Sequence, residues 1–204
     1  MSEHCRVVSE VRDGGRGEDH VGIFRDHGRL VVAVADGAGG TGSGAFAANM
    51  VIDEADAFAR GARESAAMAL MAAERAMFNV GGQSTGIILL VSGAVIRGAS
   101  VGDSECWWLV DDGFVDVTSA QVRKPLLGDG AMPVAFGPFP ATGRLLLGTD
   151  GLFNYVSSGQ ILEVAYQSNI DEAARELAGL PRLPNGEWPD DLGLVLVDLD
   201  VPDI

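Results

Sequence analysis

Apolar residues recur along the chain with two different periods. Short runs that are apolar at almost every position, such as LVVAVA at 30–35, are typical of strands covered on both faces. Longer stretches place apolar residues at helical spacing, as with Phe46, Met50 and Val51. The pattern predicts strands at 6–11, 20–26, 28–35, 84–92, 94–101, 105–110, 114–117, 144–149 and 192–199, and helices at 45–60, 62–80, 157–167 and 169–178.

The order of these segments predicts the fold class. Strands come first, then two helices, many strands, two more helices and a final strand, which is not the regular alternation of a parallel doubly wound sheet. Strands joined as hairpins, with helices grouped apart from them, favour an α+β fold whose helices pack on antiparallel sheets. With 204 residues, the chain is expected to form one domain, 1–204. The segment at 118–143 is rich in proline and glycine and is expected to form an irregular lid.

Composition and charge exclude several classes of function. The formal net charge is -15, which opposes binding to nucleic acid or to an anionic membrane. No apolar run approaches the roughly 18 residues that span a bilayer, and the N-terminal residues lack the pattern of a signal peptide. Cys5 and Cys106 are too few for a disulfide framework and are expected to be reduced thiols. We therefore expect a cytoplasmic protein without nucleic-acid or membrane partners.

Two aspartates, each followed by a glycine, differ from the other Asp-Gly pairs. Asp36 and Asp150 both follow an all-apolar run and both precede sequence with a helical pattern. An Asp-Gly pair is ordinarily a turn, as we expect at Asp112, where two alternating strands flank it. Two buried strands that end in carboxylates can direct both side chains at one point. Asp36 and Asp150 are therefore candidate ligands or catalytic residues.

Further acidic residues lie where predicted strands begin or end. Like charges gathered at one place repel strongly, and divalent cations remove that repulsion. Oxygen ligands without His or Cys favour Mg²⁺ or Mn²⁺, and with three histidines in the chain a zinc site is a poor fit. The additional candidates are Glu18 and Asp19 before the second strand, Asp103 after a strand broken by Gly102, and Asp190 and Asp191 before the last strand.

The glycines after Asp36 suggest an alternative. Residues 37–42 match the G-x-G-x-x-G fingerprint of dinucleotide-binding proteins. However, Asp36 would place a carboxylate beside a pyrophosphate. The acidic residue expected about 20 positions further on should end a second strand, yet Glu54 lies in a helical pattern. Nucleotide binding therefore stays as the less favoured hypothesis.

Six segments, taken in order, resemble the motifs of the PPM (PP2C-type) metal-dependent serine/threonine phosphatases, and the likeness is greatest to their compact bacterial branch. The likeness covers nearly the whole chain. Each segment alone is a weak signal, and the six in sequence are a strong one. They are RGED (16–19), VADGAGG (34–40), GGQSTGIIL (81–89), ASVGDSECWWL (99–109), LLLGTDGLFNYV (145–156) and PDDLGLVLV (189–197).

This resemblance implies a fold and an activity. The fold would be a four-layer αββα sandwich of two antiparallel sheets flanked by helix pairs. The activity would be hydrolysis of phosphoserine or phosphothreonine in proteins by a metal-activated water. Two Mn²⁺ or Mg²⁺ ions would be required, with a third, weaker ion seen in bacterial members. The partner would be a phosphorylated protein, with a cognate Ser/Thr kinase or its target, and the enzyme would act as a monomer in bacterial signalling.

The resemblance also implies roles for single residues. Asp36 would bridge two ions and, with Asp150 and an arginine, would be essential to catalysis. Which arginine binds phosphate stays open, because Arg16 is nearer to the Glu-Asp pair than usual and Arg12 is farther away. The remaining metal ligands would be the Gly37 carbonyl, Glu18 through water with Asp19 beside it, Asp103 for the third ion, Asp150, and either Asp190 or Asp191, with Asp190 favoured.

Of two departures from the family pattern, one supports a second hypothesis. The flap over the site, here 118–143, is shorter than usual, and this departure motivates the hypothesis. Ala38 stands where some members have a histidine proposed as a general acid, but other bacterial members also lack that histidine. The alternative to an active phosphatase is a catalytically weak regulatory module of the same fold that binds a phosphoprotein.

Overall fold

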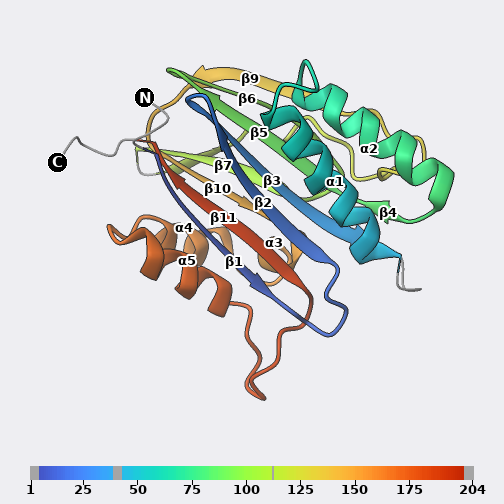
Figure 1. Ribbon diagram of the computed structural model, residues 1–204. Coiled ribbons are helices and arrows are strands. Elements are labelled where there is room, and N and C mark those ends of the chain that lie inside the picture. The colour runs from blue at the N-terminus through green and yellow to red at the C-terminus, as the bar shows by residue number, and fades with distance from the viewer. Residues whose placement is uncertain (1–4, 39–42, 112, 200–204) are drawn as a thin grey trace.

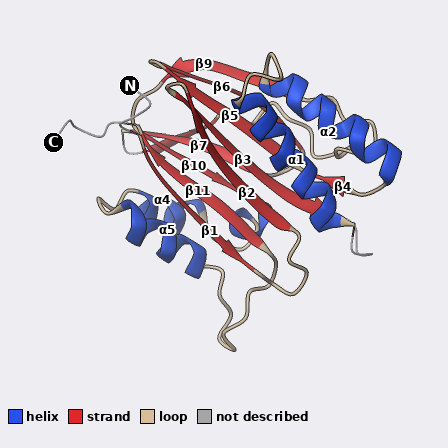
Figure 2. Cartoon of the chain, in the orientation of Figure 1, coloured by secondary structure: helices blue, strands red, loops and turns tan. Residues whose placement is uncertain are grey.

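The computed structural model describes residues 5–38, 43–111 and 113–199 (Figure 1). Two antiparallel sheets pack face to face, and helices cover the outer face of each sheet (Figure 2). This arrangement confirms the predicted α+β fold and the αββα sandwich. Three sequence features, namely the glycines at 39–42, the turn at Asp112 and His4, lie outside the described residues.

The strand order follows the order of the strands in the sequence in one sheet but not in the other. Sheet I holds five strands and sheet II holds six. The order in sheet I is β1 (Arg6–Arg12), β11 (Leu192–Asp198), β10 (Arg144–Gly148), β7 (Glu105–Val110) and β8 (Gly113–Asp116). The order in sheet II is β2 (Asp19–Asp26), β3 (Arg29–Ala38), β5 (Gly86–Ser92), β6 (Val95–Val101) and β9 (Val134–Pro140), and β4 (Gln83–Ser84) pairs with the end of β3.

The helices form two groups, one on each sheet. The long helices α1 (Gly44–Ala59) and α2 (Ala66–Val80) bury alanine-rich faces against sheet II. The shorter α3 (Asp150–Phe153), α4 (Ser158–Ala165) and α5 (Ile170–Gly179) pack on sheet I. Within the described residues, no helix is both long and apolar enough to pass through a bilayer.

A third core lies between the two sheets and determines where the acidic residues can meet. Val32 and Val34 of β3 belong to it, so Asp36, two positions further along, points toward the same inter-sheet face. The same alternation in sheet I runs from Val197 through Val195 toward Asp191. The ends of these strands therefore direct acidic residues to one end of the sandwich.

The predicted strands and helices are present, but three details of the prediction were wrong. Part of the segment at 118–143 is the strand β9, which pairs with β6 across a register shift between Ile96 and Gly98. Its prolines are tolerated because β9 is an edge strand. The second helix begins at Ala66, after the Ser65 side chain accepts a hydrogen bond from the Met68 N–H. The short helix α3 was not predicted as a separate element.

Candidate metal centre

Asp19 and Asp36 lie opposite one another on neighbouring strands of sheet II. The register of β2 and β3 pairs them directly. Asp36 turns its backbone N–H and C=O toward Thr85 on the other side of the strand. The Asp19–Asp36 pair is therefore of the non-hydrogen-bonded kind, in which facing side chains lie closest. The two carboxyl groups lie close enough to affect one another's pKa, so the strand register alone brings two candidate ligands together.

Sheet I brings other acidic residues to the same end of the sandwich. Asp150 is the first residue of α3, just after β10, and Asp190 and Asp191 precede β11. Beside them, Gly193 lies so close to sheet II that a Cβ added to it would be 3.7 Å from the Asp19 Cβ. The two sheets are in contact at this end, so carboxylates from both sheets influence one another. We refer to Glu18, Asp19, Asp36, Asp103, Asp150 and Asp190 as the acidic cluster.

Three carboxyl groups of the acidic cluster, those of Asp19, Asp36 and Asp150, have a raised pKa. Burial raises the pKa of Asp36, and the charge of Asp150 raises it further. Burial is also the main cause of the raised pKa of Asp19, followed by the charge of Asp36. The pKa of Asp150 is raised by burial and then by the charges of Asp103 and Asp190. Such mutual repulsion is the electrostatic setting in which a divalent cation binds favourably.

Two oxygen atoms of the acidic cluster are buried without a hydrogen-bond partner, Glu18 Oε2 and Asp19 Oδ2. The residues that carry them are 5% and 6% exposed. A buried carboxylate oxygen without a donor is costly, and an all-oxygen set of this kind fits a hard cation. As the side chains stand, no three His, Cys, Asp or Glu side chains in the described part of the chain form a group that could hold a metal ion. An ion held by two of these carboxylates would take its remaining ligands from carbonyl and water oxygens.

The backbone after Asp36 passes very close to the start of α1. A Cβ on Gly37 would overlap the carbonyl group of Gly44, and a Cβ on Gly44 would overlap the Glu18 carboxylate. The Gly37 N–H donates to the Glu18 carbonyl at 3.2 Å. Glycine at both positions lets Glu18 lie against the helix start beside the Gly37 carbonyl, which the sequence named as a ligand.

Asp190 and Asp191 have different surroundings. The Asp191 carboxylate accepts hydrogen bonds from the backbone N–H groups of Gly14 and Glu18, both at 2.7 Å. Burial acts to raise the pKa of Asp191, but these and neighbouring N–H groups outweigh it and lower the pKa. Asp191 therefore holds the loop that precedes Glu18. The charge of Asp190 raises the pKa of Asp36 and Asp150, and the charge of Asp191 raises that of Asp19. Both residues therefore act on the acidic cluster, and Asp191 differs in being held by the backbone N–H groups of the loop before Glu18.

Two arginines neutralise part of the acidic cluster. Arg16 forms an ion pair with Asp190. Arg123 donates two hydrogen bonds to Asp103, at 2.7 and 3.1 Å. The arginine side chains are 57% and 71% exposed, so each pair costs little to separate. Either guanidinium could leave its aspartate and meet an anion at the edge of the cluster.

Sequence reasoning missed several polar residues that support the acidic cluster. The Thr149 hydroxyl accepts from the Gly193 N–H at 2.9 Å, and its closeness to Asp19 acts to lower the pKa of Asp19. Asn154 donates to Asp150 Oδ2 at 2.8 Å, one helical turn away. Thr85 and Ser104 form a buried hydroxyl pair behind Asp36. All four lie inside the motif segments. The contacts of Thr149, Thr85 and Ser104 depend on pairing between distant strands, whereas the Asn154 contact is local to α3.

The two cysteines have no role in this site. Cys5 and Cys106 are free and buried in the inter-sheet core. Burial raises the pKa of the Cys106 thiol strongly, and a protonated thiol is a poor nucleophile. Their burial is that of structural thiols, and their reduced state stays a prediction.

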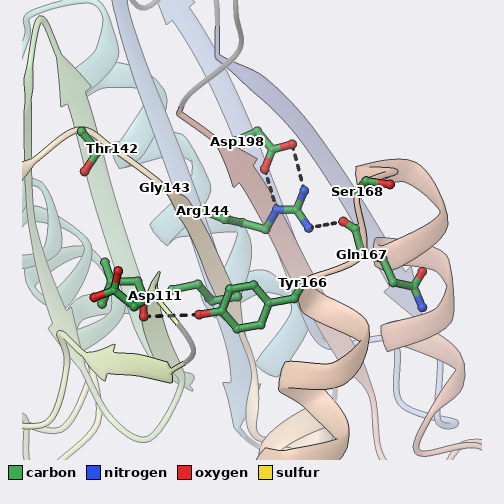
Figure 3. Close-up of a pocket in the computed structure, with 10 residues that line it drawn as sticks. Asp111, Thr142, Gly143, Arg144, Tyr166, Gln167, Ser168 and Asp198 are labelled. Carbon is green, nitrogen blue, oxygen red and sulfur yellow. Dashed lines mark hydrogen bonds and ion pairs between the residues drawn. The ribbon is translucent and has the colours of Figure 1, made fainter.

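Two pockets occupy different ends of the sandwich. A polar pocket of about 180 Å³ adjoins Asp103 and Arg123. A larger one, of about 580 Å³, lies where β10 begins and β11 ends. There the Arg144 guanidinium lies between Asp198 and the Gln167 carbonyl (Figure 3). Asp198 and Gln167 thus satisfy the charge of Arg144, the cation of the larger pocket. The larger pocket therefore shows no buried unsatisfied group among the described residues that line it, and pocket size does not identify the candidate site.

No family model and no curated protein matches the sequence. Solved structures match over nearly the whole chain. The serine/threonine phosphatase PstP/Ppp of Mycobacterium tuberculosis is 23% identical with a TM-score of 0.81, covering 96% of this chain and 98% of that one. The serine/threonine phosphatase Stp1 of Staphylococcus aureus is 18% identical with a TM-score of 0.80, covering 96% and 95%.

A further match is the catalytic domain of PstP in complex with two manganese ions. It is 23% identical with a TM-score of 0.80, covering 95% of this chain and 97% of that one. At these identities the likeness establishes the fold. The resemblance to bacterial PPM-type phosphatases that the motifs suggested is therefore confirmed at the level of the fold.

Proposed function

We propose that this protein is a divalent-metal-dependent phosphatase that hydrolyses phosphoserine or phosphothreonine in proteins. The observation that carries the proposal is the acidic cluster, in which carboxylates from both sheets meet with two buried oxygens left without donors. The fold, shared with bacterial serine/threonine phosphatases, one of them solved with two manganese ions, supports it.

The residues of the acidic cluster would have different roles as metal ligands. Asp36 would be shared between two Mn²⁺ or Mg²⁺ ions, with the Gly37 carbonyl, Asp150 and Asp190 beside it and Glu18 and Asp19 on the opposite strand. Asp103 would serve a third ion. When bound, the ions supply an activated water and charge stabilisation for phosphoryl transfer. Asp191 would hold the loop that carries Glu18.

Arginine would bind the phosphate of the substrate. Arg16 lies at the edge of the cluster, and the charge of Asp190 is the main cause of its raised pKa, so it remains a cation. A guanidinium matches the geometry of phosphate oxygens. Arg16 would exchange its exposed ion pair with Asp190 for the phosphoryl group of the substrate. Arg12 forms an ion pair with Glu10 instead, which favours Arg16.

The test is hydrolysis of a phosphoserine peptide with Mn²⁺, compared with the same reaction in a chelator. We expect turnover that depends on Mn²⁺ and is lost by several orders of magnitude in Asp36→Ala. Asp53→Asn, which removes an exposed charge on α1, is the control and should retain turnover. Full activity in a folded Asp36→Ala protein would overturn the proposal.

A catalytically weak module that binds a phosphoprotein is the second candidate. The observation that favours it is the pairing of Asp103 and Asp190 with arginines, together with the spacing of the carboxylates. In that case calorimetry would detect binding of a phosphopeptide, and Mn²⁺ would produce no turnover of a generic phosphomonoester. Manganese-dependent turnover would exclude this candidate.

The proposed setting follows from the fold relatives and from the charge. We propose a monomer in the cytoplasm of a bacterium that acts on a phosphorylated protein, opposite a Ser/Thr kinase. The net charge of -15 would repel strongly acidic substrates. Phosphopeptides with neutral or basic flanking residues should therefore be hydrolysed faster than acidic ones.

A further inference from the structure

The backbone of Asp36 is held by Thr85 in an unusual way. The pairings on either side, Val34 with Ile87 and Gly37 with Ser84, place Asp36 opposite Thr85 without an insertion. A regular antiparallel pair of this kind exchanges two backbone hydrogen bonds. Here the Thr85 N–H donates to the Asp36 carbonyl at 2.8 Å, but the Asp36 N–H donates to the Thr85 hydroxyl at 3.0 Å. The Thr85 hydroxyl oxygen thus takes the place of the Thr85 carbonyl oxygen as the acceptor for the Asp36 N–H.

The Thr85 hydroxyl connects to a buried chain of hydrogen bonds. It lies 2.7 Å from the Ser104 hydroxyl, and both residues are buried, at 2% and 0% exposure. The Gln121 side-chain amide then donates to the Ser104 carbonyl at 2.6 Å. Asp103, which Arg123 binds, directly precedes Ser104 and therefore lies next to these hydrogen bonds. The chain therefore links the segment after β8 to Asp36.

The same segment is fixed to sheet II at a second place. Leu127 exchanges two backbone hydrogen bonds with Ser84, at 3.0 and 3.2 Å. The Ser84 hydroxyl, with one proton to donate, lies between the carbonyls of Asp36 and Thr85, at 2.9 and 2.7 Å. The buried Glu74 carboxylate accepts from the N–H groups of Gly128 and Gly130. Both routes end at the backbone of Asp36.

We propose that Thr85 is a positioning residue for Asp36, and that Ser104 and Gln121 transmit the position of the segment 118–131 to it. This inference deepens the proposed function and rests on it for the role of Asp36. Groups that orient a metal ligand typically change metal affinity about 10–100-fold when removed. Thr85 would act in this way through the backbone, without touching substrate or metal.

The decisive comparison is between Thr85→Val, which keeps the branched shape but loses the hydroxyl, and Thr85→Ser, which keeps the hydroxyl. Mn²⁺ affinity is measured by calorimetry. We expect Thr85→Val to weaken binding about tenfold and Thr85→Ser to restore it. In the metal-free protein, amide exchange followed by NMR should be about tenfold faster at Asp36 in Thr85→Val and unchanged at Val32.

The matched control is Ser100→Ala. Ser100 Oγ is also a buried hydroxyl oxygen in sheet II, and it has no hydrogen-bond partner. Removing it should leave both Mn²⁺ affinity and exchange at Asp36 as they are. If Thr85→Val does not fold, Gln121→Ala tests the outer end of the chain and should show a smaller change of the same sign.

The outcomes separate the two proposals. Wild-type affinity and wild-type exchange at Asp36 in Thr85→Val would overturn the positioning role, as would an equal loss in Ser100→Ala. Faster exchange at Asp36 in a protein whose wild type neither binds Mn²⁺ nor hydrolyses phosphoserine would keep the positioning of Asp36 and reject the phosphatase.

Discussion

The two ends of the sandwich differ in whether their charged side chains have all their hydrogen-bond partners. At one end the Arg144 guanidinium is 13% exposed and donates to both oxygens of Asp198 and to the carbonyls of Ala165 and Gln167. At the other end, Glu18 and Asp19 each retain a buried oxygen without a donor. The first arrangement satisfies its charges, and the second leaves them unsatisfied.

The difference separates structure from function. A buried ion pair whose hydrogen bonds are complete needs nothing more and serves to connect α4 to sheet I. Carboxylates that raise one another's pKa destabilise the fold unless a ligand binds them. The larger pocket lies at the satisfied end. Unsatisfied charge is therefore a better guide to the candidate site than pocket volume.

The largest expected effect comes from neutralising a carboxylate at the acidic end. Asp150→Asn should lower manganese-dependent hydrolysis by a factor of about 10²–10³, because it removes a charge that would hold the ion. Steady-state rates on a phosphoserine peptide measure this. The control is Asp111→Asn, which removes an exposed carboxylate at the opposite end. Equal losses in both variants would contradict the contrast between the two ends.

Breaking the ion pair between Arg144 and Asp198 at the other end should lower the free energy of unfolding and leave manganese-dependent hydrolysis unaffected. Arg144→Met leaves Asp198 and the carbonyls of Ala165 and Gln167 without their donor. Because the pair is partly buried, the loss should fall between about 1 kcal/mol for an exposed pair and about 3–5 kcal/mol for a fully buried one. Urea unfolding should show this loss, while the Mn²⁺ dependence of the remaining folded protein stays unchanged. Arg6→Met removes the exposed pair with Asp171 and should cost less than about 1 kcal/mol. A shift in Mn²⁺ affinity in Arg144→Met would show that the two ends are coupled.

The acidic end should also make the metal-free protein sensitive to pH. The pKa is raised to about 6 for Asp36 and to about 9 for Asp19. Carboxyl groups with a raised folded pKa favour the fold when protonated. Their contribution is therefore complete below the unfolded value of about 4 and is lost as the pH rises toward about 9.

Urea unfolding in chelator across this pH range tests the prediction. The free energy of unfolding should fall as the pH rises, and Asp19→Asn should flatten the fall because its amide does not ionise. Arg144→Met should keep the wild-type slope. A metal-free protein whose stability rises over this range would show that the carboxylates are not in repulsion.

The smallest effect is expected at the edge of the cluster. Arg123→Ala releases Asp103 from its ion pair, so Mn²⁺ should bind a few-fold more tightly, as measured by calorimetry. Stability should change by less than about 1 kcal/mol, because the arginine is exposed. Arg60→Ala, which breaks the exposed pair with Asp56 on α1, is the control and should not alter Mn²⁺ affinity. Weaker Mn²⁺ binding in Arg123→Ala would show that the arginine assists the ion.

Local pattern predicted most of the fold. Buried strands such as β3 and β10 are apolar over most of their length, and an aspartate follows each apolar run: Asp36 lies near the end of β3 and Asp150 begins α3 just after β10. The strand β9 escaped prediction because its prolines and glycine mimic a loop. They are accommodated only because β9 has a neighbour on one side alone, and that position depends on the whole sheet.

The candidate site was predictable in its residue types but not in its pairings. Asp36 and Asp150 could be selected because each follows a buried strand. The choice between Asp190 and Asp191 depends on backbone N–H groups more than 170 positions away. The role of Thr85 depends on a bond missing from a strand ladder. Such features arise from tertiary pairing, which periodicity in one segment does not reveal.

The position of β11 has a consequence for synthesis of the chain. It follows the other described strands in the chain, yet it lies in sheet I between β1 and β10. Until the ribosome releases this segment, β1 lacks the strand that pairs with it in sheet I, and Asp190 and Asp191 have not joined the acidic residues that precede them in the chain. A nascent or truncated chain that lacks β11 should therefore be unable to bind Mn²⁺, and Mn²⁺ binding should appear only after β11 has been synthesised.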